Sequence, residues 1–206
     1  MSAVSKVILL NEEDVSFARE LAVIASGQEK QRRGFYGTPD GRGWNSPVQH
    51  LVGKLGELAT KKYLSVPPLR VYPYFEKIGR SAPSDITVEF HQASIHIEVK
   101  SWRDHDWPRL GRCIRPEQFQ KILSYRNIVM WCCVDSEALD LSSAQSIPVA
   151  LMGFSKSHDL VNMQLMETAP GALNYQLDAS LVRGMDELSE TFISFALYKQ
   201  RTISSL

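Results

Sequence analysis

Apolar residues recur at intervals of three and four in two segments near the start of the chain, which is the spacing of a helix with one buried face. The first segment covers residues 11–31, where Asn11 is a suitable N-cap and three acidic residues follow it. The second covers residues 46–64, with Pro47 at the first helical position. A stretch rich in Gly and Pro lies between them and predicts a loop.

Apolar and polar residues then alternate, which is the pattern of strands with one buried face. The predicted strands cover residues 70–75, 85–90 and 94–102. The short connection between the last two predicts a tight hairpin. Residues 127–134 are apolar on both faces, which indicates a central strand covered on both sides. A helix over residues 115–126 precedes this strand, and another strand over residues 147–154 follows it.

The order of these elements predicts an α/β fold with a central mixed β-sheet flanked by helices. We expect one domain over residues 1–206, with its core at 46–156, an N-terminal helical extension and loop at 1–45, and a C-terminal elaboration at 157–206. Within that elaboration, a short helix is predicted over 180–189.

Composition excludes several classes of protein. The 206 residues are 44% hydrophobic and 22% charged, ordinary values for a chain that buries a core. No apolar run is long enough to span a membrane, so we expect no membrane partner. Three cysteines are too few for a disulfide framework, which favours a reducing, cytoplasmic setting.

The net charge of +0 conceals an uneven distribution of charge along the chain. Residues 28–115 carry 15 Lys and Arg against 9 Asp and Glu, whereas the flanking segments are acidic. A basic region is what a polyanionic partner such as nucleic acid requires. A solvated surface without a partner explains the same charges, so both interpretations stay open.

The strongest chemical feature is an acidic residue, Asp85, followed after 12 intervening residues by Glu98-Val99-Lys100. Strand alternation places Glu98 and Lys100 on one face, and Asp85 opens the neighbouring strand. Two carboxylates from adjacent strands suit a hard cation such as Mg²⁺, which lowers the pKa of bound water and polarises phosphoryl oxygens. Lys100 would then position or deprotonate the water, or offset charge developing on phosphorus. The alternative is an ordinary solvated strand face.

The helix predicted over 46–64 carries a third acidic candidate, Glu57. Gly53, Gly56, Glu57 and Thr60 lie together on the helix, away from its apolar stripe. Each Gly inside a helix is about 1 kcal/mol less favourable than Ala, so the pair predicts that another backbone passes close by. This would aim Glu57 toward the sheet edge where Asp85 begins. In the alternative, Glu57 is simply exposed.

These motifs together resemble the PD-(D/E)XK nuclease superfamily, which has the restriction-endonuclease-like fold. The resemblance rests on Glu57 in Gly56-Glu57-Leu58-Ala59, on Pro83-Ser84-Asp85 and on Glu98-Val99-Lys100. The α-β-β-β-α-β order of elements agrees with the core of that fold, over about residues 48–134. One departure is Ser84, since the family has proline directly before the aspartate.

The resemblance implies Mg²⁺-dependent hydrolysis of phosphodiester bonds, and we expect Mn²⁺ to substitute. It implies Asp85 and Glu98 as metal ligands, the backbone carbonyl of Val99 as a further ligand, and Lys100 as the catalytic lysine. Glu57 would be an accessory metal ligand or would orient the other groups.

A polar loop is predicted over residues 103–115, after the Glu98-Val99-Lys100 strand. This segment combines cations with aromatic rings, a composition that suits phosphate contact and base stacking. The residues predicted to contact nucleic acid are Ser101, Arg103, Arg109, Arg112 and Arg115. The alternative is a surface loop in which Asp104 and Asp106 pair with some of the charge.

The sequence thus predicts a metal-dependent nuclease, and we expect an endonuclease that hydrolyses DNA. DNA is favoured over RNA only through the family resemblance. A symmetric homodimer is expected, since enzymes that cut both strands commonly pair two sites. The alternative is a catalytically inactive nucleic-acid-binding or assembly protein on the same fold.

Overall fold

The computed structural model describes residues 5–33, 47–73, 84–91, 93–125, 128–140, 146–169 and 171–203. The strands are β1 (Lys6–Leu10), β2 (Arg70–Pro73), β3 (Ile86–Phe90), β4 (Ala93–Arg103), β5 (Cys113–Ile114), β6 (Ile128–Val134), β7 (Ile147–Lys156), β8 (Gln164–Ala169) and β9 (Ala172–Gln176). The α-helices are α1 (Glu12–Arg33), α2 (Pro47–Leu64), α3 (Trp107–Leu110), α4 (Pro116–Tyr125), α5 (Ser136–Asp140) and α6 (Leu188–Ile203). The predicted loop between α1 and α2, and Pro83, lie outside the described residues.

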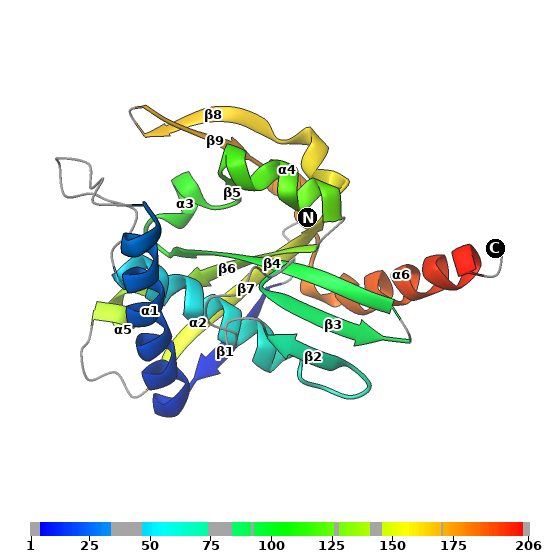
Figure 1. Ribbon diagram of the computed structural model, residues 1–206, viewed down its shortest axis with the longest axis horizontal. Helices are drawn as coiled ribbons and strands as arrows, with labels where there is room; N and C mark the ends of the chain where they lie inside the picture. The colour runs from blue at the N-terminus through cyan, green and yellow to red at the C-terminus, as the bar shows by residue number, and fades with distance from the viewer. Residues whose placement is uncertain are drawn as a thin grey trace.

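A mixed six-stranded sheet in the order β1-β7-β6-β4-β3-β2 forms the centre of the fold (Figure 1). Strands β4 and β6 are parallel, and the other neighbouring pairs are antiparallel. The connection between the parallel strands contains α4, as a parallel pair requires a crossover. The prediction of an α/β fold with a central mixed sheet flanked by helices is therefore confirmed.

The predicted helix starts follow from local capping chemistry. Asn11 accepts a hydrogen bond from the Asp14 amide at 2.9 Å, and the Asp14 carboxylate accepts one from the Asn11 amide at 3.1 Å. This reciprocal cap satisfies backbone donors at the start of α1. Pro47 is the first residue of α2. The backbone N–H at this position has no partner within the helix, so proline, which lacks it, loses no hydrogen bond.

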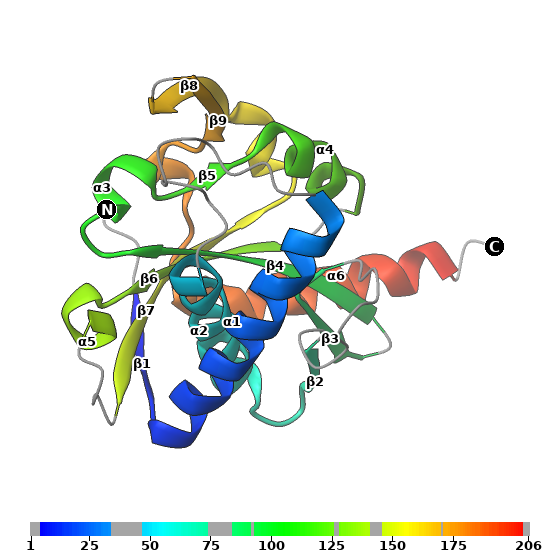
Figure 2. The same ribbon diagram turned by 60° about the vertical axis from the view of Figure 1, so that its left-hand side comes forward.

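Two hydrophobic cores cover the two faces of the sheet. Helix α2 lies on one face, with α1 crossing outside it and α6 beside it (Figure 2). Helix α4 and a small second sheet, in the order β5-β9-β8, cover the other face. Strand β6 supplies Met130 and Cys132 to the first core and Val129 and Trp131 to the second. The prediction of a doubly covered central strand is thus confirmed.

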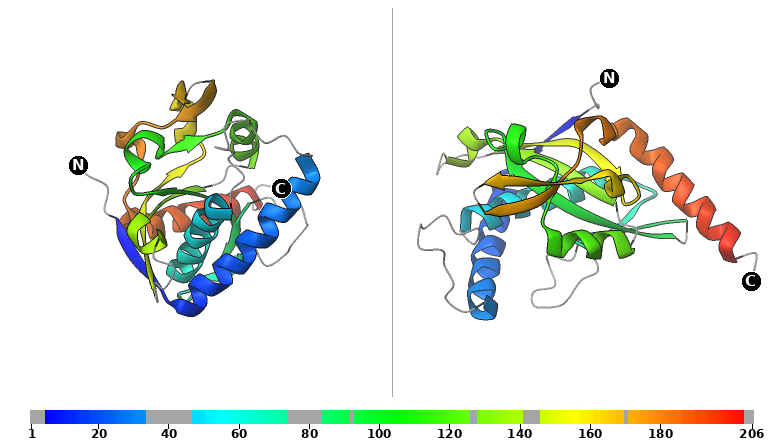
Figure 3. Two further views of the ribbon diagram at one scale, coloured as in Figure 1. Left: turned by 90° about the vertical axis from the view of Figure 1, so that its left-hand side faces the viewer. Right: turned by 90° about the horizontal axis from the view of Figure 1, so that it is seen from above.

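The structure differs from the sequence-based prediction after β7. The helix predicted over 180–189 is wrong, because Phe154 and Arg183 exchange two backbone hydrogen bonds of 3.1 and 2.8 Å. This bridge requires extended backbone at Arg183 and divides the segment into two 3-10 turns, Ala179–Leu181 and Met185–Glu187. The regular helix α6 then begins at Leu188 and extends beyond the sheet (Figure 3).

Several further elements were not predicted from the pattern. Strand β1 forms an edge of the main sheet beside β7, and Val7 and Leu9 on it are exposed. The segment over 103–115, predicted as a loop, contains α3 and β5. None of the helices in the described ranges is long and apolar enough to cross a membrane.

The contact between α2 and the sheet depends on Gly56. A Cβ atom at this position would meet the side chain of Ser101, with its Cβ at 3.0 Å, and the Cβ of Cys132 at 3.3 Å. The interpretation that a glycine here permits close approach is therefore right for Gly56. It is wrong for Gly53, where no described atom lies within 4 Å of the added Cβ. The middle of α2 is also buried beyond its apolar stripe, Thr60 included.

These two glycines give a matched prediction. Gly56→Ala should lower the free energy of unfolding by about 1–3 kcal/mol, because the helix must move away from β4 and β6. Gly53→Ala should raise it by about 0.5–1 kcal/mol, because alanine is the better helix former and meets no described neighbour. Urea denaturation measures both variants, and equal effects would contradict the packing described here.

Candidate functional site

The pairing of β3 with β4 brings Asp85 and Glu98 to the same place in the sheet. Ile86 lies opposite Ile97, and the Asp85 amide donates to the Ile97 carbonyl at 3.1 Å. Asp85, one residue before β3, is therefore bonded to β4 beside the Ile86–Ile97 pair, which brings its carboxylate close to Glu98. This is the convergence of two carboxylates that strand alternation predicts.

The Asp85 carboxylate is held against the backbone of β4. Its Oδ2 atom accepts a hydrogen bond of 2.7 Å from the Val99 amide. In a strand, the amide and carbonyl of one residue point to the same side, so the Val99 carbonyl also faces the side of Asp85. The predicted backbone ligand thus lies on the edge of β4 from which Asp85 approaches.

Lys100 and Glu98 form an ion pair within the site. The Lys100 ammonium donates to Glu98 Oε1 at 2.6 Å, and the two side chains are only 15% and 12% exposed. The pair follows from their i, i+2 spacing on one face of β4. In this arrangement Lys100 is a charged donor beside the carboxylates.

Glu57 enters the site from α2 and is 8% exposed. The prediction that this helix supplies a third acidic group agrees with the structure, although the carboxylate has a partner that we did not predict. The Lys54 ammonium donates to both Glu57 oxygens, at 2.8 and 2.7 Å. The signal was present in the sequence, since residues three apart on a helix are neighbours.

Burial and mutual repulsion shift the pKa values of these groups. Burial raises the pKa of Asp85 to about 8, with help from the charges of Glu98 and Glu57 and against Lys100 and the Val99 amide. Burial also raises the pKa of Glu57, and Lys54 opposes that rise. Burial acts against the charged form of Lys100, but Glu98 and Asp85 outweigh it and raise the pKa of this ammonium. These four groups therefore act on one another as a single cluster.

The donor set of the cluster fits a hard divalent cation, but its side chains do not form a ready cage. Three carboxylates and the Val99 carbonyl are oxygen ligands of the kind Mg²⁺ prefers. Among the described residues no three acidic, His or Cys side chains stand in an arrangement that could hold an ion. Asp85 is turned to the Val99 amide, Glu98 to Lys100 and Glu57 to Lys54. With every group ionised, three negative charges face two positive ones, an imbalance that a cation would relieve.

The structure places the hydroxyl of Ser101, a predicted nucleic-acid contact, against packed side chains. Alternation along β4 turns Ser101 away from the face of Lys100 and toward α2. Its hydroxyl is buried between Gly56 and Cys132 without a hydrogen-bond partner of normal geometry, although it lies close enough to lower the pKa of the Cys132 thiol. Burial outweighs that effect and raises the pKa of this thiol to about 12. Ser101 is therefore a packing residue.

Two of the predicted nucleic-acid-binding arginines hold the second sheet in place. Arg109 donates to the Thr168 carbonyl at 3.1 Å, and Arg112 donates to the Leu177 carbonyl at 3.1 Å. The Arg112 guanidinium also lies 5.8 Å from the centre of the Trp107 ring. These contacts tie the segment after β4 to β8 and the end of β9. They give both arginines a structural role that sequence spacing does not reveal.

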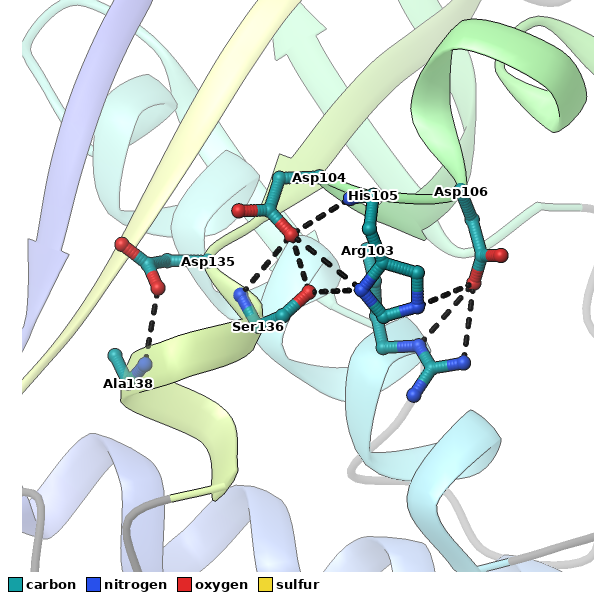
Figure 4. A network of polar contacts seen from close by, with 7 residues as sticks. All are labelled: Arg103, Asp104, His105, Asp106, Asp135, Ser136 and Ala138. Carbon is teal, nitrogen blue, oxygen red and sulfur yellow. Dashed lines mark hydrogen bonds and ion pairs between the residues drawn. The ribbon is translucent and has the colours of Figure 1, made fainter.

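Arg103 belongs to a polar network at the ends of β4 and β6 (Figure 4). It donates to Asp106 at 3.2 Å, which is the pairing that the surface-loop alternative predicts. Ser136 donates to Asp104 through its hydroxyl and its amide, and the hydroxyl bond lowers the pKa of the Asp104 carboxyl. His105 Nδ1 lies 2.7 Å from the Ser136 hydroxyl. The network fastens the start of α5 to the end of β4.

Arg115, the last of the predicted contacts, lies at the start of α4. Its guanidinium is 3.9 Å from the Glu117 carboxylate, and its side chain is 31% exposed. The pair is long and partly solvated, so it contributes little to stability.

Comparison with known proteins adds no family assignment, since no family model, curated protein or solved structure matches the chain.

Asp85 gives a pH-dependent prediction. Its pKa rises from 3.8 to about 8 on folding, so the folded chain holds a proton that the unfolded chain releases in this window. With a chelator present, stability should therefore fall as the pH rises from 3.8 to about 8. Asp85→Asn keeps an acceptor for the Val99 amide, and at the upper end it should be more stable than the wild type by on the order of 2 kcal/mol, allowing for partial exposure.

Urea denaturation across this pH range measures the difference between the two proteins. Asp178→Asn is the control, because Asp178 is exposed and the Ser180 hydrogen bonds lower its pKa. This variant should give no gain at high pH. If the stabilities of the wild type and of Asp85→Asn changed in parallel with pH, the surroundings of Asp85 would not raise its pKa, and the prediction would be wrong.

Proposed function

We propose that this protein is a metal-dependent nuclease that hydrolyses DNA phosphodiester bonds with a PD-(D/E)XK type of site. The observation that carries the proposal is the convergence of Asp85, Glu98, Lys100 and Glu57 from β3, β4 and α2. Ion pairs on protein surfaces are common, but a buried cluster with an excess of carboxylates is unfavourable for folding alone. Perturbed carboxylates of this kind are concentrated at functional sites.

The topology supports the restriction-endonuclease-like part of the proposal. Ignoring the short α3 and β5, the order from α2 to β6 is helix, three antiparallel strands, helix, and a strand parallel to the third. This is the α-β-β-β-α-β order expected from the sequence. The acidic groups lie where the second and third strands of that unit meet, and the first helix delivers the remaining carboxylate.

The residues that would hold Mg²⁺ or Mn²⁺ are Asp85, Glu98, the Val99 carbonyl and Glu57. Such a cation, when bound, lowers the pKa of water and stabilises negative charge on a phosphoryl oxygen. The chain itself fixes the ligands on three elements. The backbone hydrogen bond from Val99 orients Asp85, and the packing of Gly56 fixes the position of Glu57.

Lys100 supplies positive charge at the reacting phosphate. Its ammonium donates to Glu98 at 2.6 Å. Because the side chain is largely buried, water screens its charge only weakly. A donor in this setting can orient the attacking water and offset the charge that grows on phosphorus. The raised pKa of Lys100 favours these roles over proton abstraction, which needs the neutral amine.

We propose DNA as the substrate and internal cleavage as the reaction, with two copies of the chain supplying one site for each strand. The basic segment over 28–115 supports a polyanionic substrate. Arg109 and Arg112 contribute less to that argument than the sequence indicated, because their side chains bind backbone carbonyls.

The test is a cleavage assay with supercoiled plasmid, linear duplex, single-stranded DNA and RNA. We expect nicking or linearisation of plasmid with Mg²⁺ or Mn²⁺ and none with EDTA. Lys100→Ala should lower the rate by about 100-fold or more, because charge stabilisation at phosphorus is lost. Lys62→Ala is the matched control, since Lys62 pairs with Asp14 on the exposed side of the same fold.

Two results would reject this function. One is the lack of cleavage of every substrate with either metal. The other is a Lys100→Ala variant that cuts as fast as the wild type, because another site would then be responsible.

A further inference from the structure

Lys54 stands in the place where a cation would meet Glu57. Its ammonium lies 2.8 and 2.7 Å from the two carboxylate oxygens, and the paired side chains are 19% and 11% exposed. Both oxygens are therefore engaged by one donor in a largely buried position. A hard cation needs at least one of them, so Lys54 and the cation cannot both bind Glu57 in this way.

The two partners differ in how freely they can move. Gly56 packs against Ser101 and Cys132, which fixes the backbone beside Glu57 against β4 and β6. Lys54 carries its charge on a flexible four-carbon chain, one helical turn away. An exchange of partners at Glu57 therefore requires the lysine side chain to swing aside, with no change in the packing of α2.

Charge also favours an exchange. With all groups ionised, Glu57, Asp85 and Glu98 against Lys54 and Lys100 leave one net negative charge. One divalent cation turns this into one positive charge, which a single phosphodiester group would neutralise. Displacing Lys54 keeps its charge nearby, so the balance for a phosphate is preserved.

We propose that Lys54 is a built-in competitor of the metal: it holds Glu57 until a divalent cation displaces it, and it thereby sets the metal affinity of the site. This inference rests on the proposed function, because it requires a metal at Glu57. Lys54 is thus a positioning residue that acts through Glu57. The displaced ammonium joins Lys100 as a second positive charge beside the substrate.

The test measures Mn²⁺ binding by titration calorimetry on the full chain at mildly alkaline pH. Lys54→Met removes the competitor and should tighten Mn²⁺ binding by about tenfold. Lys54→Arg should weaken it several-fold, because a guanidinium forms a stronger two-bond pair with a carboxylate. Lys62→Met is the control for the loss of one positive charge from α2, and its affinity should equal that of the wild type.

The order of affinities, Met above Lys above Arg, would not arise from a packing role for Lys54. Should Lys54→Met fail to fold, the comparison of Lys54→Arg with the wild type still tests the proposal. If the wild type binds Mn²⁺ and both Lys54 variants match it, the competitor role is overturned while the proposed function stands. If the wild type neither binds Mn²⁺ nor cleaves any substrate, the function is rejected and this inference with it.

Discussion

The candidate site depends on keeping three carboxylates close together in a place that water barely reaches. Burial and the charges of Glu98 and Glu57 raise the pKa of Asp85 to about 8. Two lysines and one backbone amide reduce the repulsion without removing it. The arrangement persists because each acidic residue is fixed to a rigid element: Asp85 by the register of β3 with β4, Glu98 within β4, and Glu57 by the contact of Gly56 with the sheet.

The remainder of the fold supports this arrangement from both sides of the sheet. The core under α2 holds the helix that carries Glu57. The core on the opposite face packs β6 against α4 and the small second sheet, so that β4 has a rigid parallel neighbour. Arg109 and Arg112 fasten the segment after β4 to that second sheet. Both arginine side chains therefore hold the elements around the site together by donating to backbone carbonyls. This structural role accounts for positive charges in the segment without requiring a bound polyanion.

The sequence predicted the parts of the site that depend on local periodicity. Alternation was enough to place Glu98 with Lys100 and to bring Asp85 close to them, and the same alternation already argues against Ser101 at the substrate face. The ion pair of Lys54 with Glu57 could also have been predicted, because residues three apart on a helix are neighbours. What could not be predicted depends on distant partners: Arg112 binds a carbonyl 65 residues away, and Arg183 bridges to Phe154 and interrupts the helix expected over 180–189. No local pattern records such contacts.

The energetic cost of the cluster is itself an argument about its role. Replacing a buried charged group by a well-packed apolar one is often neutral or stabilising, so stability alone gives no reason to gather Glu57 and Glu98 around Asp85. A fold built only for stability would have leucine or valine at these positions, as in the cores on either face. Local conflict of this kind within an otherwise consistent structure is typical of functional sites. A bound cation that prefers oxygen would resolve this conflict, so the electrostatics of the cluster support the proposed divalent metal without reference to any motif.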